Sequence, residues 1–595
     1  QSLTLSAENN IIVNAGLSGV NGSINLTADA DLSSVGGSAS NFVGSISGAG
    51  TLAAAAVTLS AATGITTGNI TATSVSVSNS TSGNVDITNS SGTVALGMSS
   101  IGTLKITSSG NISQTGPLSV TGVSTLTAPA AITLSDAGNN FGSLNVAGTT
   151  VTITENSATE LAGVNATTLN LVSGGAITQT GALSVGGVAT LTAPSAAITL
   201  SNAGNDFGTV TILGTTTTDA TINDASALVL GGLDITGNLD VDASGLLTDT
   251  GVSAVDGTAS IAMTGSGLAI TLNDLDVTGA IDVNTAATSN ATLVNAVAIE
   301  FSATATSTVN GDLTATATTG DITDASGATL VVTGLADLTG ANIVLGDNAD
   351  TTNFGSLNVA GTTVTITEDS ATELADVDAT TLNLVSGGAI TQTGALSVGG
   401  VATLTAPSAA ITLSNAGNDF GTVTILGTTT TDATINDASA LVLGGLDITG
   451  NLDVDASGLL TDTGVSAVDG TASIAMTGSG LAITLNDLDV TGAIDVNTAA
   501  TSNATLVNAV AIEFSATATS TVNGDLTATA TTGDITDALG ATLVVTGLAD
   551  LTATGSNIVL GDDAGDTTNF GSLNVEATTV TITENSATEL AGVNA

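Results

Sequence analysis

The sequence has no Cys, His, Trp, Tyr or Arg, and Lys105 is its only cationic side chain. Without Cys it can form no disulfide. Without His, Cys and Arg it lacks most of the bases, nucleophiles and oxyanion-stabilising groups that enzymes use. Without a basic surface it has nothing to neutralise phosphates, which excludes nucleic acid as a partner. We therefore expect neither an enzyme nor a nucleic-acid-binding protein.

Aromatic residues and long apolar runs are also scarce. An ordinary chain of 595 residues would divide into several domains with aromatic-rich cores, but this one has only eight Phe. Carboxylates alone support sugar hydrolysis in glycoside hydrolases, but sugar clefts usually have aromatic platforms, and this sequence has almost no aromatic residues. No apolar run is long enough to predict a transmembrane segment.

The residues that are present predict an all-β fold. Fifty-two acidic residues give a net charge of −51, and charge together with 72 Gly would favour disorder. However, 42% of the residues are hydrophobic, and they alternate with Thr and Asn, as in Val151-Thr152-Ile153-Thr154 and Ile198-Thr199-Leu200. Alternation places the apolar groups on one face of a short strand and the polar groups on the other.

A block of about 213 residues occurs nearly verbatim twice and then begins again. The segment Phe-Gly-Ser-Leu-Asn-Val opens each copy, at Phe141, Phe354 and Phe570. We expect divergent coils over residues 1–140, long repeats over 141–353 and 354–569, and the start of a third over 570–595. Such periodicity is typical of a solenoid in which each unit contacts only its neighbours. We read the chain as one continuous solenoid and a window on a longer polypeptide.

A shorter pattern lies inside the long repeat. The motif Leu-x-Val/Ile-x-Gly ends at Gly122, Gly148, Gly187, Gly237 and Gly279, at intervals of about one or two times 20 to 28 residues. That interval is the length of one coil of a parallel β-helix, so we predict roughly 25 coils of 20 to 28 residues. Each glycine is expected to supply a corner with positive φ.

Five Phe share the context Asn/Asp-Phe-Gly, which favours a structural role. Asn or Asp suits the turn, and Phe would fill a wide corner of the core. The alternative is an exposed aromatic residue that binds a ligand. The predicted structural corners are Phe141, Phe207, Phe354, Phe420 and Phe570.

The segments Gly175 to Ala193 and Ala197 to Gly208 resemble the coils of filamentous-haemagglutinin-like and autotransporter-like bacterial surface proteins. The resemblance covers most of the chain from near Ile24 onward. It implies a right-handed parallel β-helix, secretion across the bacterial envelope, and a place at the cell surface or in the extracellular matrix.

Acidic residues carry the only chemical hypothesis. Asp240-Val241-Asp242 and its copy Asp453-Val454-Asp455 resemble the start of a calcium loop, although Gly251 stands where a closing Glu is expected. The alternative is that these carboxylates are solvated or cap turns. We expect no firm cofactor, and calcium or other divalent cations bound diffusely between like charges on neighbouring coils. The outward groups expected to stack in this way are Asp234, Asp240, Asp276 and Asp282.

A second acidic cluster lies later in each long repeat. Asp347-Asn348-Ala349-Asp350 becomes Asp562-Asp563-Ala564-Gly565-Asp566 in the following copy.

Two functions are compatible with these patterns. The first is a structural protein that forms an extracellular or cell-surface filament, with self-association end to end or laterally. The second is the stalk of a giant adhesin whose binding tip lies elsewhere and contacts host or neighbouring-cell surfaces. A distinct terminal domain would favour the adhesin, and an uninterrupted array would favour the filament.

Overall fold

The computed structural model describes residues 1–28, 43–97 and 99–595, and in these residues it contains strands and no helix. The strands form a parallel β-solenoid of about 27 turns with about 21 residues per turn. The predicted fold class is therefore confirmed, and the turns lie at the short end of the expected range. Part of the region predicted as divergent coils, residues 29–42 and 98, lies outside the described residues. No described helix is long and apolar enough to cross a bilayer.

The described residues divide into two compact units, Gln1–Ala296 and Val297–Ala595. In the first unit, a turn consists of a longer and a shorter strand, for example β22 (Leu228–Ile235) with β23 (Leu239–Ala243). The next turn supplies β24 (Leu247–Val255) and β25 (Ala259–Met263). β22 pairs in parallel with β24, and β23 pairs with β25, so two ladders run through the coils.

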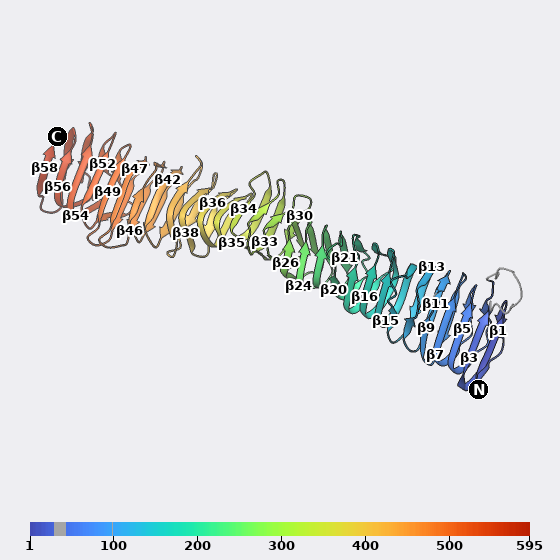
Figure 1. The fold of residues 1–595 in the computed structure, drawn as a ribbon. Helices are drawn as coiled ribbons and strands as arrows, with labels where there is room; N and C mark the ends of the chain where they lie inside the picture. Colours follow the sequence, from blue (N-terminus) through green and yellow to red (C-terminus); the bar gives the residue numbers. More distant parts are fainter. Residues whose placement is uncertain (29–42, 98) are drawn as a thin grey trace. The chain divides into compact units, whose positions relative to one another are not determined.

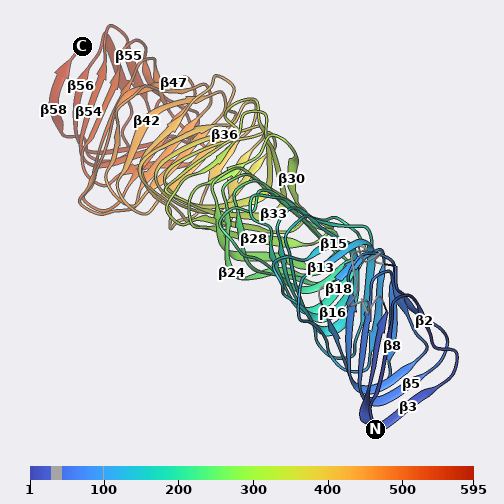
Figure 2. The same ribbon diagram turned by 45° about the vertical axis from the view of Figure 1, so that its right-hand side comes forward.

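The same neighbour relation holds at the beginning of the first unit. There, β3 (Leu17–Ala28) and β5 (Leu52–Ala61) lie side by side in both views (Figures 1 and 2) and pair in parallel.

The core of the first unit is built from columns of apolar side chains. Leu239 is aligned with Ala259, and Val241 with Ile261, and all four side chains are buried. The residues between them face outward because successive side chains of a strand point to opposite faces. Burying a Leu, Ile or Val side chain contributes about 1.5–3 kcal/mol, so each coil stabilises its neighbours.

The second unit repeats this plan, and like the first unit it includes some long strands. β35 (Thr351–Glu368) pairs in parallel with β36 (Thr372–Ser386), and β36 pairs with β38 (Leu396–Thr405) (Figure 1). The register between β36 and β38 shifts between Ala379 and Leu382, where the longer strands are irregular. One long strand therefore supplies two runs of inward-facing residues.

The glycines of the Leu-x-Val/Ile-x-Gly motif do not adopt positive φ, so the reason predicted for them is wrong. They are required by the closeness of the neighbouring coil. A Cβ on Gly187 would lie 2.7 Å from the carbonyl oxygen of Thr167, and one on Gly279 would lie 2.3 Å from that of Gly257. Both separations are too short for a side chain, which explains why only glycine fits.

Candidate functional site

The predicted calcium residues lie on strands rather than in loops. Asp240 and Asp242 belong to β23, and Asp453 and Asp455 belong to β43 (Leu452–Ala456). In each strand the two carboxylates lie on the outward face, between buried apolar residues. Among the described residues, neither pair belongs to a group of three acidic side chains with carboxylate oxygens close enough to share a metal ion. Calcium binding at these pairs stays a prediction.

Electrostatics at these pairs are mildly unfavourable. Burial raises the pKa of Asp240, the charge of Asp242 raises it further, and a hydrogen bond from Ser260 opposes both effects. In the second copy, burial raises the pKa of Asp455 and the charge of Asp453 adds to it. Two carboxylates on one strand face thus repel each other without enclosing a binding position.

The carboxylates expected to stack on neighbouring coils are in fact two coils apart. Ala254 is aligned with Asp234 on one side and with Asp276 on the other. Ser260 likewise separates Asp240 from Asp282, and Asp282 is buried. The expectation of contiguous outward ranks was therefore wrong for these residues. Alternation with Ala and Ser doubles the spacing from about 4.8 to about 9.6 Å and reduces like-charge repulsion.

The structure places the five predicted corner Phe in the core, each at most 6% exposed. Their backbone N–H groups share one kind of acceptor, a carboxylate at the end of the same turn. The bonds join Phe141 to Glu155, Phe207 to Asp224, Phe354 to Glu368, Phe420 to Asp437 and Phe570 to Glu584. The first four of these carboxylates are buried.

Each buried carboxylate is held by several donors. Oε1 of Glu155 accepts from the N–H of Phe141 at 2.8 Å and from the Ser157 hydroxyl at 3.0 Å, and Oε2 accepts from Thr159 at 2.9 Å. Desolvation nevertheless raises the pKa of Glu155, against the effect of these bonds. Asp224 is arranged similarly, with bonds from Phe207 and Ser226 and a pKa raised by burial.

These acids were missed in the sequence, although a signal exists. A Ser follows two residues after each of them, as in Glu155-Asn156-Ser157 and Asp224-Ala225-Ser226. Their geometry serves the fold: the carboxylate caps a backbone donor at a core corner, and the residues around it offer no reacting pair.

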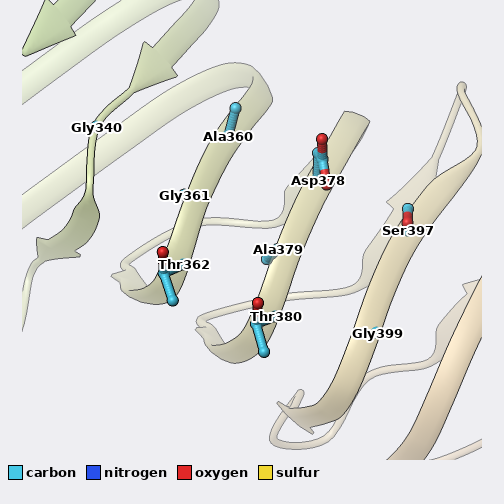
Figure 3. Close-up of a pocket in the computed structure, with 9 residues that line it drawn as sticks. All are labelled: Gly340, Ala360, Gly361, Thr362, Asp378, Ala379, Thr380, Ser397 and Gly399. Carbon is cyan, nitrogen blue, oxygen red and sulfur yellow. The ribbon is translucent and has the colours of Figure 1, made fainter. Parts of the chain in front are cut away.

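A shallow hollow of about 430 Å³ lies on the second unit, across β35, β36 and β38 (Figure 3). Asp378 lies between Ala360 and Ser397 on the neighbouring strands, and the rest of the lining is Gly, Ala and Thr. Asn165 replaces Asp378 in the first copy. The lining residues hold one carboxylate and no base that could activate a nucleophile.

The carboxylates that do come together in threes are found at other corners of the second unit. One group is Asp324, Asp347 and Asp350, and the other is Asp537, Asp562 and Asp566. The sequence indicated the loop residues of both groups but gave no reason to join them to Asp324 and Asp537, which lie in preceding coils.

A family model described as repeats of unknown function (DUF5649) matches seven consecutive stretches, which together span most of the chain. The chain belongs to this family of tandem repeats. Its matches are residues 82–147, 148–214, 217–287, 288–359, 360–427, 430–500 and 501–574. Matches beginning at residues 217 and 430, and at 288 and 501, fall at the same places in the two long copies. Three family repeats therefore make one long repeat, and each corresponds to roughly three turns.

No curated protein and no solved structure matches the chain significantly.

Proposed function

We propose that this chain is a structural repeat protein that forms a filament at the cell surface or in the extracellular matrix. The observation that carries the proposal is the pair of parallel ladders, in which strands of one coil bond to strands of the next. Extension along such a stack is opposed by many backbone hydrogen bonds at once. In this role the number of near-identical repeats determines the length of the filament rather than any chemical activity.

Composition supports an exposed location. A chain with no Arg and one Lys offers trypsin-like proteases a single cleavage site, at Lys105, whose side chain forms an ion pair with Asp86 at 3.1 Å. A net charge of −51 keeps such molecules apart in solution until cations or partners intervene. The resemblance to filamentous-haemagglutinin-like and autotransporter-like proteins supports the same location, and we expect self-association end to end or laterally. We expect no enzymatic activity, because the sequence supplies neither His, Cys nor Arg.

Electron cryomicroscopy of material sheared from intact cells tests the proposal, with antibody labelling of the chain on unbroken cells. Continuous fibres much longer than one polypeptide, labelled along their length, are expected. Discrete rods rooted in the envelope, each with a differently shaped tip, would overturn the filament and assign the array to an adhesin stalk. Label found only after the cells are broken open would overturn the surface location.

A further inference from the structure

Five three-residue strands share the sequence Ile-Ser/Thr-Gln or Ile-Thr-Asp and end at a corner of the core. Three end in Gln: β12 (Ile112–Gln114), β17 (Ile177–Gln179) and β37 (Ile390–Gln392). Two end in Asp: β32 (Ile322–Asp324) and β53 (Ile535–Asp537). The fold thus offers neutral and acidic versions of one corner for comparison.

At the Gln corners, the terminal side chain forms a closed pair with an Asn in the following coil. Gln179 Nε2 donates to Asn205 Oδ1 at 2.8 Å, and Asn205 Nδ2 donates back to Gln179 Oε1 at 3.0 Å. Asn205 is fully buried and immediately precedes β20 (Asp206–Ile212). The pair is neutral, and each amide has both a donor and an acceptor. The same reciprocal bonds join Gln114 to Asn139 and Gln392 to Asn418.

At the acidic corners, both positions are carboxylates. Asp324 ends β32, and Asp350 immediately precedes β35, as Asn205 precedes β20. Both side chains are about nine-tenths buried, at 9% and 8% exposed. Two ionised carboxylates offer only acceptors, so they cannot bond to each other as the amides do. Each carboxylate therefore depends on backbone donors, on a proton or on a cation.

One carboxylate oxygen at this corner has no partner. Asp324 Oδ2 accepts from the N–H of Gly346 at 2.8 Å, whereas Oδ1 is buried and forms no hydrogen bond. The oxygens of Asp350 are occupied by the N–H groups of Gly327, Ala328 and Asn348. A buried acceptor without a donor costs about 1–3 kcal/mol, and more when the group is charged.

A third carboxylate completes the group. Asp347 is exposed, and one oxygen from each of Asp324, Asp347 and Asp350 lies within 4.8 Å of the others. Three negative charges at this separation repel strongly, and the single Lys of the chain is paired with Asp86 in the other unit. Desolvation, followed by the charges of Asp350 and Asp347, raises the pKa of Asp324 from 3.8 to about 6.

The second copy retains this geometry despite a longer loop. Five residues run from Asp562 to Asp566 where four run from Asp347 to Asp350. Asp537 Oδ2 accepts from the N–H of Gly561 at 2.9 Å, and Asp537 Oδ1 again has no partner. Asp566 Oδ1 accepts from Gly540 at 2.7 Å, and Asp566 is 8% exposed. The insertion is absorbed in the loop, and the three carboxylates still meet.

We propose that each three-aspartate corner binds a divalent cation, with Asp324, Asp347 and Asp350 as ligands in one copy and Asp537, Asp562 and Asp566 in the other. The ligand atoms are all carboxylate oxygens, which suits a hard cation. Calcium fits best because it accepts irregular oxygen sets and completes its coordination with water, whereas magnesium demands near-octahedral geometry. The ion joins consecutive coils where the amide pair joins them elsewhere, and the exposed Asp347 and Asp562 give it access from solvent.

Calorimetric titration of the full chain with CaCl₂ tests this site. At about 0.15 M NaCl the Debye length is about 8 Å, so diffuse binding is reduced. The corner variant carries Asp324→Gln, Asp350→Asn, Asp537→Gln and Asp566→Asn, which copies the amide pairs of the other corners. The control carries Asp240→Asn, Asp242→Asn, Asp453→Asn and Asp455→Asn, which removes the same charge from strand faces.

We expect the wild type and the control to bind two calcium ions per chain with equal affinity. The corner variant should bind at least about ten-fold more weakly, since two ligands of each site are lost. Equal binding by all three proteins, or loss in the control alone, would overturn the assignment. If circular dichroism shows that the corner variant does not fold, Asp347→Asn with Asp562→Asn replaces it, because both residues are exposed. Unchanged affinity in that variant would likewise refute the site.

Discussion

The backbone N–H of Phe207 donates a 2.6 Å hydrogen bond to Oδ2 of Asp224, a buried carboxylate at the end of the same turn. The same relation recurs at the other four corner Phe, with Asp or Glu as the acceptor. A chain with almost no cations therefore keeps acids in its core by surrounding them with backbone and hydroxyl donors. The acid accepts a hydrogen bond from the backbone N–H of the corner Phe, which the strand ladder leaves unpaired.

Removal of one such acid should open the coil locally. Glu368→Ala leaves the N–H of Phe354 buried without an acceptor, which costs about 1–3 kcal/mol. Because stability in a solenoid is a sum of local terms, the loss should appear in the coils around Phe354 rather than along the whole chain. Hydrogen exchange followed by mass spectrometry measures it. Glu373→Ala, at an exposed position of the next strand, β36, is the control, and equal protection in the two variants would contradict the role of Glu368.

The Gly of the Phe-Gly motif should be intolerant of a methyl group. A Cβ on Gly421 would lie 2.5 Å from the carbonyl oxygen of Gly399, which belongs to the preceding coil. Gly421→Ala must therefore separate the two coils, and we expect a loss of about 1–3 kcal/mol. The matched control is Gly399→Ala, since its Cβ would have no atom within 4 Å. The two free energies of unfolding, measured by denaturation, should differ clearly, and equal values would show that the contact is relieved at little cost.

The sequence was sufficient for the fold because its signals are local. Alternation in segments such as Val151 to Thr154 determines which side chains face inward, and the repeat length predicts the number of residues in each coil. The interpretation of the motif glycines failed because two physical causes, positive φ and a close neighbour, select the same residue. For Gly187 only the register between coils shows that the cause is the carbonyl of Thr167.

The candidate sites were harder to predict from the sequence, because their residues meet across coils rather than within one segment. Asp324 and Asp350 are 26 residues apart, and their meeting depends on the length of the intervening turn. Asp240 and Asp242 are close in sequence, yet positions two apart on a strand share a flat face. A group that encloses an ion needs ligands from different coils, and this information lies in the pairing register.

The cation-free protein should become more stable as the pH falls from about 7 toward 4. The pKa of Asp324 is raised from 3.8 to about 6 in the folded chain, so the folded state binds the proton more tightly than the unfolded state. Its stabilising effect is complete below the unfolded value and is lost as the pH rises through about 6. Burial also raises the pKa of Glu155 and Asp224, which act in the same direction. Thermal unfolding in a chelator, at several pH values, measures this dependence.

Substitution at the acidic corners measures how much they contribute to this pH dependence of stability. Asp324→Gln with Asp537→Gln should reduce the rise in melting temperature on acidification, because neither position can then take up a proton. An unchanged pH profile in this variant would assign the effect to the carboxylates at the Phe corners instead.

Spacing of the outward acids predicts the response to salt. Ala254 separates Asp234 from Asp276, which places these carboxylates about 9.6 Å apart, close to the Debye length of about 10 Å at 0.1 M salt. The melting temperature should therefore rise with NaCl at low ionic strength and level off near 0.1 M. Ala254→Asp would put three carboxylates on consecutive coils, about 4.8 Å apart, and should lower the melting temperature at low salt. The comparison is Ala254→Asn, because Asn is nearly the same size as Asp and carries no charge. A deficit in the Asp variant that persists unchanged at high salt would mean that packing, rather than repulsion, requires the alternation.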